Sequence, residues 1–170
     1  MDQSDFDLFA LFEAVDKRRR EGELSWASVA KEVNRFRTTR RAIAVTTITG
    51  LRHKPVGEGD GILQVLLWLG RTPESFVSDI PDADSERFRL PTLTTGQILR
   101  WDTHALFLAL NAHRLKRQLT WSEVARELKG FTSEMLTNLS KGGRIGFPRV
   151  MRLVRWLGKP AVTFTRIADW

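Results

Sequence analysis

The sequence predicts an all-α chain made of two tandem helical bundles with about five helices each, and three observations support this prediction. The segment "LSWASVAKEV" (24–33) returns at an offset of 95 as "LTWSEVAREL" (119–128), with five of the ten positions identical. Apolar residues elsewhere follow the i, i+3, i+4 spacing of amphipathic helices. No stretch alternates convincingly between apolar and polar residues, as a half-buried strand does. A duplicated unit of about 75 residues, which is large enough to fold alone if only marginally, explains the chain.

The first helix of each unit is predicted from its apolar face and its start signals. In "FDLFALFEAVDKRRR" (6–20) this face comprises Phe6, Phe9, Phe12 and Val15. Ser4 is the expected N-cap of that helix. In the second unit, Thr94 and Gln97 have the spacing of a capping box and are expected to start the equivalent helix.

The remaining helices have start and stop signals at matching places in the two units. "SWASVAKEV" (25–33) is expected to bury Trp26, Val29, Ala30 and Val33. Thr120 and Glu123 form a capping box that fixes the start of its counterpart. "ILQVLLWLG" and "VMRLVRWLG" end at Gly70 and Gly158, which suit the residue after a helix C-terminus, and Pro73 and Pro160 then allow a last short helix.

Composition divides the chain and excludes several classes of protein. Residues 1–80 form the first predicted domain, 81–96 a Pro- and Thr-rich linker, and 97–170 the second domain. Phe88, Leu90 and Leu93 of the linker either pack between the units or leave it extended. The chain has no cysteine and three scattered histidines, so we expect no disulfide, metal site or cofactor. No apolar run approaches a membrane span, and the acidic start "MDQSDFD" argues against a signal peptide.

The net positive charge is confined to the second part of the sequence. Through Ile80 there are 12 Lys and Arg against 12 Asp and Glu, whereas residues 81–170 hold 15 against 8 and carry the whole net charge of +7. A basic domain indicates a polyanionic partner, usually nucleic acid. The alternative is a surface that is charged only for solubility.

The segment "GFTSEMLTNLSKGGR" (130–144) is the most informative for function. Thr132 or Ser133 can cap a helix whose inward side is formed by Met135, Leu136 and Leu139. Its outward side carries short polar residues, although Lys or Glu would be better helix formers. Such side chains suit a helix in the major groove of DNA, since they reach base edges without holding the helix away. The alternative is a helix that is merely solvated.

Both units resemble the helix-turn-helix of the lambda-repressor-like family, also called the xenobiotic-response-element (XRE) family of regulators. The residues that carry the resemblance are "LTWSEVAREL-KG-FTSEMLTNLSKGG" followed by "VMRLVRWLG". Leu136 and Leu139 match the Leu-x-x-Leu pair that closes the family's recognition helix. The second unit fits this frame well and the first fits it loosely. The resemblance implies a five-helix bundle whose third helix enters the major groove.

The resemblance also implies roles for individual residues of the second unit. The groove-facing positions would be Thr132, Ser133, Glu134, Thr137 and Asn138. Asn138 would read adenine and Glu134 would accept a hydrogen bond from a cytosine amine. The phosphate contacts would come from Lys141, Arg144 and Arg149. Trp26 and Trp121 stand where the family often has Gln, so their indoles either donate to phosphate or pack in the core.

The first unit departs further from the family. Matching Ile48 to Leu139 gives an offset of 91, which places four extra residues in the turn within "NRFRTTRR". The recognition helix is then expected from about Thr39 to Leu51, with Val45 and Ile48 inward. The expected DNA contacts of this unit are Arg37, Arg40, Arg41, Thr46, Thr47, Arg52 and Lys54. The alternative is a solvated loop on a copy that has lost DNA contact.

These observations predict a sequence-specific, double-stranded DNA-binding transcriptional regulator, such as a repressor, and not an enzyme. We find no pattern of catalytic residues, and an enzyme fragment is the weakest candidate. The alternative is a protein-binding regulatory module, an antitoxin or an anti-activator, in which one unit binds a partner protein. A homodimer is compatible with the sequence. The resemblance implies a cytoplasmic, nucleoid-associated protein of bacterial or phage-like type.

Overall fold

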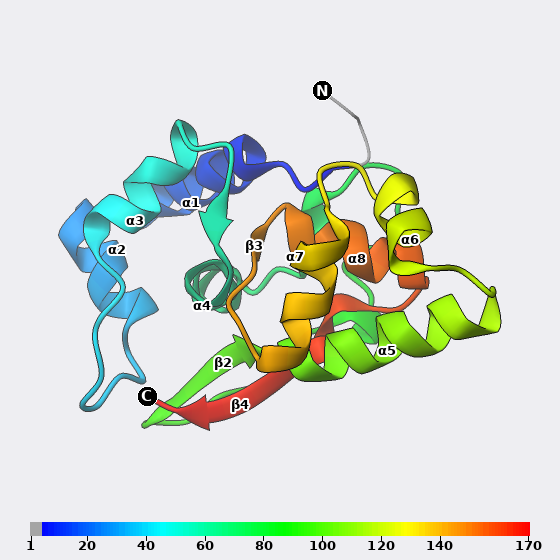
Figure 1. Ribbon diagram of the computed structural model, residues 1–170. Helices are drawn as coiled ribbons and strands as arrows, with labels where there is room; N and C mark the ends of the chain where they lie inside the picture. The colour runs from blue at the N-terminus through cyan, green and yellow to red at the C-terminus, as the bar shows by residue number, and fades with distance from the viewer. Residues whose placement is uncertain (1–4) are drawn as a thin grey trace.

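The computed structural model describes residues 5–170 and has a mainly helical architecture with a few short strands (Figure 1). The first part of the chain contains α1 (Leu8–Glu21), α2 (Trp26–Val33), α3 (Val45–Thr49), β1 (Gly57–Glu58) and α4 (Gly59–Leu69). The second contains β2 (Gln97–Trp101), α5 (Thr103–Lys116), α6 (Trp121–Glu127), α7 (Ser133–Asn138), β3 (Gly146–Phe147), α8 (Arg149–Leu157) and β4 (Thr165–Asp169). The 3₁₀ helices are η1 (Gly50–Arg52), η2 (Pro73–Phe76), η3 (Glu86–Phe88), η4 (Leu139–Lys141) and η5 (Ala161–Phe164).

The first helix of each half is capped by an aspartate. The Asp7 carboxylate accepts a hydrogen bond from the Ala10 N–H at 2.9 Å, and Asp102 accepts from the Ala105 N–H at the same distance. Ser4, the expected N-cap, lies outside the described residues. The expected capping box at 94–97 does not start a helix, although the Gln97 side chain accepts from the Thr94 N–H at 2.9 Å. The residues that follow form β2 instead.

Most of the other helix signals are confirmed. Thr120 and Glu123 make both hydrogen bonds of the capping box at the start of α6. Gly70 and Gly158 follow α4 and α8 in the left-handed conformation, with φ of 66° and 68°. The 3₁₀ helices η2 and η5 begin at Pro73 and directly after Pro160.

The prediction that no stretch forms a strand was wrong. β2 pairs with β4, and β1 pairs with β3, both antiparallel. β1 and β3 are two residues long, which is too short to show an alternation. In β2, the neighbouring residues Ile98 and Leu99 are both buried, as is Trp101, so both faces of the strand are covered, and α4 packs against it. A strand that is buried in this way loses the period of two by which it could be recognised.

The predicted recognition helix of the first unit, 39–51, is also wrong over nearly its first half. Residues 39–44 are not helical, and only α3 and η1 follow them. The Asn34 side chain holds this segment as a loop, since it accepts from the Ile43 N–H at 2.8 Å and donates to the Ile43 C=O at 2.9 Å. The Thr38 N–H donates to the Trp170 C=O at 3.2 Å. These bonds satisfy the backbone without a helix.

The loop changes the alignment of the two halves. The Thr49 hydroxyl donates to the Val45 C=O at 3.2 Å, and the Thr137 hydroxyl donates to the Ser133 C=O at 3.1 Å. Ile48 is therefore equivalent to Leu136, at an offset of 88, and not to Leu139. The turn of the first half is longer by seven residues rather than by four.

Several side-chain contacts occur in both halves. The Trp68 indole donates to Glu32 at 2.7 Å, and the Trp156 indole donates to Glu127 at 2.9 Å. The rings of Phe12 and Trp26 stack at 5.7 Å, and those of Phe107 and Trp121 at 5.5 Å. The internal similarity thus extends from the sequence to the packing of side chains.

The two halves share one hydrophobic core. Phe147 on β3 is fully buried, and its ring lies 4.5 Å from Phe6 and 5.5 Å from Trp101, centroid to centroid. The linker is folded rather than extended, and its buried apolar residues are Phe88, Leu90 and Leu93. The packing of α4 and β2 is secured by the side chain of Gln64, which bonds to the backbone of Leu99.

A buried carboxylate also joins η2 to η5. Glu74 is 3% exposed, and its Oε1 accepts from the Ala161 N–H at 2.7 Å. Its Oε2 has no partner within the described residues. Burial raises the pKa of Glu74 above its usual 4.5, against the opposing effect of the Ala161 N–H. The folded state therefore binds this proton more tightly than the unfolded state does.

We expect Glu74→Gln to raise the free energy of unfolding above that of the native chain at neutral pH. At acidic pH this advantage of the variant should be smaller. The ionised carboxylate destabilises the fold, and this effect disappears as the pH falls from about 7 through the raised pKa to about 4.5. Urea unfolding of both chains across that range measures the difference in free energy of unfolding. A difference that does not change with pH would contradict the prediction.

Candidate nucleic-acid interface

α7 presents a polar side to solvent and an apolar side to the core. The Thr132 side chain caps it by accepting from the Met135 N–H at 3.2 Å. Leu136 and Leu139 are buried, as predicted, whereas Met135 is only half-buried. Among the predicted groove-facing residues, those that are exposed are Thr132, Glu134 and Asn138, and those that are half-buried are Ser133 and Thr137.

The polar side chains of α7 differ in how far they are already engaged. The Thr137 hydroxyl donates to the Ser133 and Glu134 carbonyls at 3.1 and 3.2 Å, so its proton is committed within the helix. The Asn138 carboxamide has no hydrogen-bond partner within residues 5–170. Because a carboxamide offers both donors and an acceptor, Asn138 is the side chain of α7 best able to bond to a base edge.

The basic residues after α7 are exposed. Lys141 ends η4, and Gly142 then turns the chain in the left-handed conformation, with φ of 72°. Arg144 is an exposed side chain (87%) that lies 3.9 Å from Glu58 on β1. Such an exposed pair contributes little to stability and leaves the guanidinium accessible. Arg149 is exposed at the start of α8.

Three of the predicted basic contacts of the first half lie on the loop before α3 rather than on a helix. Arg37, Arg40 and Arg41 are exposed, and the Arg37 guanidinium donates to the Arg40 C=O at 2.9 Å. The Trp170 indole donates to the Arg41 C=O at 3.3 Å, which ties the loop to the end of β4.

The other predicted contacts of this half lie on and after α3. Thr46 is exposed and Thr47 is half-buried. Arg52 is exposed, with its guanidinium 5.9 Å from the Phe12 ring centroid. Lys54 is exposed too, and its aliphatic stem lies against Gly50.

The two third helices carry different side chains at equivalent positions. With Ile48 matched to Leu136, Thr46 stands where α7 has Glu134, and Gly50 stands where α7 has Asn138. α3 therefore has neither a carboxylate nor a carboxamide with which to read a base. Arginine and threonine are the polar groups available around it.

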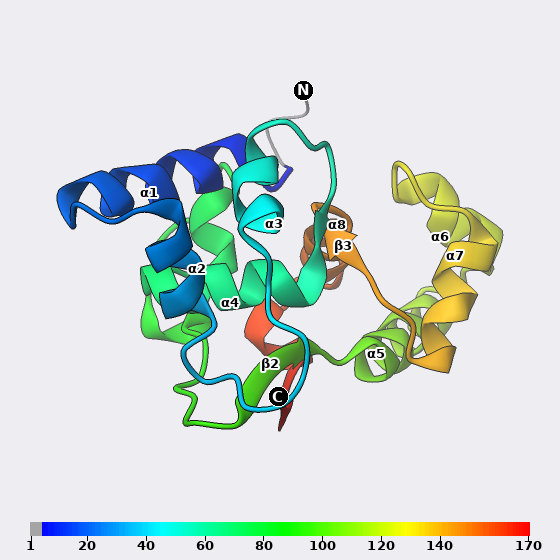
Figure 2. The same cartoon turned by 90° about the vertical axis from the view of Figure 1, so that its left-hand side faces the viewer.

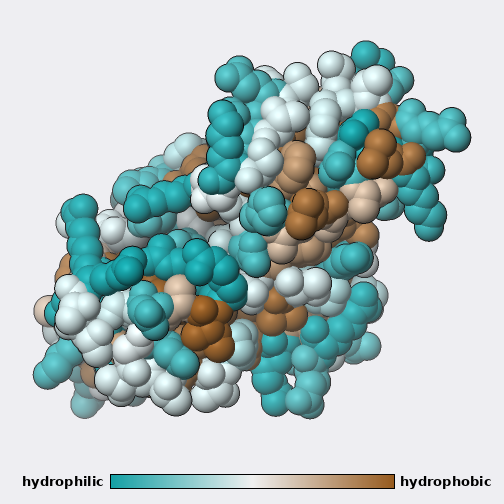
Figure 3. All heavy atoms as spheres, turned by 60° about the horizontal axis from the view of Figure 1, so that its bottom comes forward, coloured by the Kyte–Doolittle hydropathy of each residue, from teal (hydrophilic) through white to brown (hydrophobic). Residues whose placement is uncertain are grey.

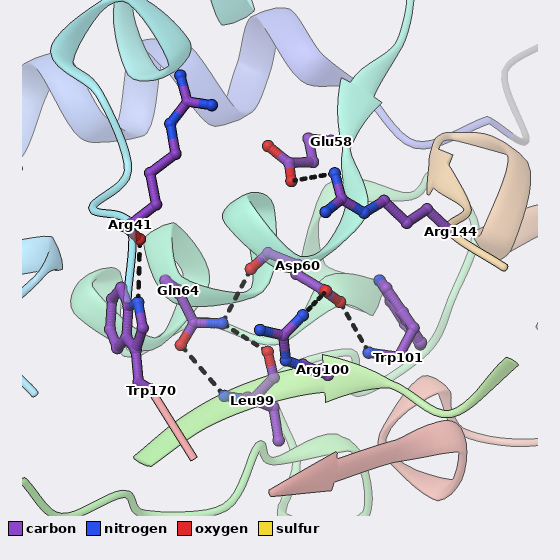
Figure 4. A network of polar contacts seen from close by, with 9 residues as sticks. All are labelled: Arg41, Glu58, Asp60, Gln64, Leu99, Arg100, Trp101, Arg144 and Trp170. Atoms are coloured by element: carbon purple, nitrogen blue, oxygen red, sulfur yellow. Dashed lines mark hydrogen bonds and ion pairs between the residues drawn. The ribbon is translucent and has the colours of Figure 1, made fainter. Parts of the chain in front are cut away.

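A groove of about 440 Å³ gathers basic residues from both halves (Figure 4). Of the predicted site residues it brings together Arg40, Arg41, Thr47 and Arg144. It also includes Arg100 on β2, which the sequence analysis missed because no motif surrounds it. Asp60 holds Arg100 at 3.2 Å and accepts from the Trp101 N–H at 3.0 Å.

The remaining predicted residues are not brought into this groove. α3 and α7 lie on opposite sides of β3 in both ribbon views (Figures 1 and 2). The predicted contacts therefore form one group around α7 and another around the loop before α3. Arg40 and Arg41 of that loop line the groove together with Arg144.

Trp26 and Trp121 pack against neighbouring side chains, which is one of the two alternatives expected for them. Both are half-buried and stack on phenylalanines, with the guanidinium carbons of Arg19 and Arg114 each 4.8 Å from the indole centroids. Neither indole N–H has a hydrogen-bond partner in the described part of the chain. Packing therefore accounts for the rings, and the N–H groups stay available.

Two further kinds of feature are absent from the described residues. Within 5–170, no group of three or more His, Cys, Asp or Glu side chains is placed to hold a metal ion. No helix in that range has the length and apolar character needed to cross a bilayer. Comparisons with protein-family models, with curated proteins and with solved structures found no match to this chain.

Proposed function

We propose that the chain is a sequence-specific, double-stranded DNA-binding transcriptional regulator built from two tandem lambda-repressor-like helix-turn-helix units, 1–80 and 97–170. The observation that carries the proposal is α7. It is a short capped helix with two buried leucines, an outward face of short polar residues and an unpartnered Asn138, and exposed Lys141 and Arg144 follow it. Such a helix can lie in the major groove while the basic residues contact phosphates.

Because the polar side chains of the two halves differ, we give the halves different roles in DNA binding. α7 would read bases through Asn138 and Glu134. The first half would contact mainly the DNA phosphates, through the arginines of its loop, because Gly50, the residue directly after α3, stands at the position of Asn138. Phosphate contacts place a protein on the duplex, whereas base contacts carry the specificity. We assign this regulator no enzymatic activity and a cytoplasmic, nucleoid-associated location.

Replacing Asn138 with Ala is expected to weaken binding to the preferred duplex by about 1–3 kcal/mol, because a bidentate contact with a base is lost. The preferred duplex is first selected from a random pool, and affinities are then measured by fluorescence anisotropy. Binding to a scrambled duplex should change little, since Asn138 faces bases and not phosphates.

Arg144→Ala is the matched comparison for this measurement. It should weaken both duplexes alike and lower the slope of log affinity against log salt by about one. An equal loss on both duplexes for Asn138→Ala would contradict its role in reading bases.

A protein-binding module is the second candidate, and one observation favours it. Leu108 and Leu115 lie on the same side of α5 and are 53% and 58% exposed, whereas the equivalent positions of α1 are Glu13 and Arg20. The view in Figure 3 likewise shows separate apolar patches within a largely hydrophilic surface. Binding that depends on this face would be disrupted by Leu108→Glu and would lack the steep salt dependence of DNA binding.

A further inference from the structure

A second groove lies away from α7, on the first half of the molecule. Its volume is about 540 Å³, within the range of sites that hold small molecules. It is bounded by the residues after α2, by the C-terminal end of α4 and by the linker segment 89–93. None of the residues predicted to contact DNA lines it.

Apolar residues form one part of the walls of this groove. Leu66 of α4 and Leu90 and Leu93 of the linker are buried, and Phe36 and Leu67 beside them are half-buried. An apolar group placed here would be removed from water on several sides, which favours binding roughly in proportion to the area covered.

The charged residues that line the groove are mostly arginines. Arg35, Arg71 and Arg89 face a single acidic residue, Asp84, which pairs with Arg71 at 3.3 Å. Arg89 has a loose, exposed pair with Glu86 at 3.7 Å. The groove thus keeps an excess of positive charge beside its apolar walls.

Among the three arginines, Arg35 is the one whose charge has no carboxylate partner within the described residues. No carboxylate lies within 4.0 Å of it in the described chain, and its guanidinium donates to the Glu32 C=O at 3.1 Å and lies 4.5 Å from the Phe36 ring centroid. Arg35 is exposed overall, and the partial burial of its guanidinium, followed by the charge of Arg18, lowers its pKa against the opposing charge of Glu32. A bound anion would offset both effects.

We propose that this groove binds a small organic anion that has an apolar body and a carboxylate or similar group. The body would lie against Phe36 and Leu67, and the anionic group would accept hydrogen bonds from Arg35 and Arg89, which can be bidentate. Inorganic phosphate lacks the apolar part, and an apolar amine has the wrong charge. The chemistry of the walls therefore selects for both features together.

The groove is connected to the loop that carries the proposed DNA contacts. The Phe36 C=O accepts from the Gly96 N–H at 2.6 Å, and Arg37, Arg40 and Arg41 follow directly in the chain. A ligand that shifts Phe36 therefore acts on this loop. The ligand would be an effector of DNA binding, and this consequence alone rests on the proposed function.

The test uses 2-naphthoate as the anionic probe and 2-naphthamide as its uncharged equivalent of nearly the same shape. Titrations of the isotopically labelled full chain, followed by the chemical shifts of its amides, should locate naphthoate at Phe36, Leu67 and Leu93. The amide and inorganic phosphate should bind at least about tenfold more weakly. Arg35→Gln and Arg89→Gln should each weaken naphthoate by about tenfold, because each removes a charged hydrogen bond.

The matched control is Arg126→Gln, since Arg126 is an exposed arginine of α6 that does not line the groove. Its affinity for naphthoate should equal that of the native chain. Equal affinity for naphthoate and naphthamide, shifts confined to other surfaces, or unchanged binding by both groove variants would overturn the proposal. These titrations contain no DNA, so they decide the question whether or not the protein binds a duplex.

The regulatory consequence is measured separately, on the duplex chosen by selection. Saturating naphthoate should change the affinity of the native chain for DNA and leave that of Arg35→Gln unchanged. If naphthoate binds in the groove and DNA affinity stays constant, the effector role is rejected while the binding site stands.

Discussion

Phe147→Ala is expected to lower the free energy of unfolding by about 3–5 kcal/mol, the range for truncating a buried phenylalanine. Phe147 is fully buried, and its ring packs against Phe6 and Trp101 at 4.5 and 5.5 Å. The cavity left behind would be lined by residues from both halves, because Phe6 belongs to the first half and Trp101 to the second. Urea unfolding followed by circular dichroism measures the loss.

Leu108→Ala is the matched control, since Leu108 is 53% exposed and should change stability by at most about 0.5 kcal/mol. The dependence on urea is informative as well. A single transition whose slope is unchanged would mean that the halves still unfold together. A loss below about 1 kcal/mol for Phe147→Ala would contradict the view that this ring joins the halves.

The helices could be predicted from the sequence because their signals are local. The apolar face of α1, the capping box of α6 and the glycines after α4 and α8 each lie within a few residues of the feature they specify. The face of α1 was wrong at Phe9, which is 51% exposed, whereas Leu8 and Leu11 are buried. The start of α5 was misplaced because Thr94 and Gln97 have the capping-box spacing, whereas Asp102 is the residue that caps the helix.

The elements that depend on distant partners could not be predicted. β2 is a strand because β4 pairs with it from the far end of the chain and α4 covers its other side. The segment 39–44 is rich in residues a helix could accept, and the bonds from Asn34 and Trp170 decide its conformation. No window of sequence contains both partners of such contacts.

The candidate site also has one part that could be predicted from local sequence and one part that could not. The exposed face of α7 follows from helical spacing, and its predicted orientation agrees with the structure at Leu136 and Asn138. The groove between the halves depends on how they pack. Arg100 enters it only because Asp60, which lies forty positions earlier on α4, holds it there at 3.2 Å.

The packing of the halves also makes the proposed specificity depend on residues far from α7. Arg144 lies beside Glu58 of the first half, and the loop with Arg40 and Arg41 is tied to the last residue of the chain, Trp170. A change that loosens this packing should therefore alter the spacing of the two groups of contacts, even where every contact residue is retained.

Gln64→Leu should produce the second largest loss of stability, about 2–4 kcal/mol, because it leaves two backbone groups of β2 buried without partners. The Gln64 amide is 2% exposed and donates to the Leu99 C=O at 2.6 Å, and its oxygen accepts from the Leu99 N–H at 3.4 Å (Figure 4). Leucine has a similar volume, so the loss would come from the hydrogen bonds rather than from a cavity.

The control for this substitution is Gln97→Leu on β2. It removes one exposed bond, from the Thr94 N–H at 2.9 Å, and should cost no more than about 1 kcal/mol. Urea unfolding compares the two variants directly. If they are equally stable, the backbone of β2 finds other partners when Gln64 is absent, and α4 is held against β2 by apolar packing alone. If Gln64→Leu is the less stable by the expected margin, this one amide accounts for much of the attachment of α4 to β2, and hence for the position of Arg100 and of the groove beside it.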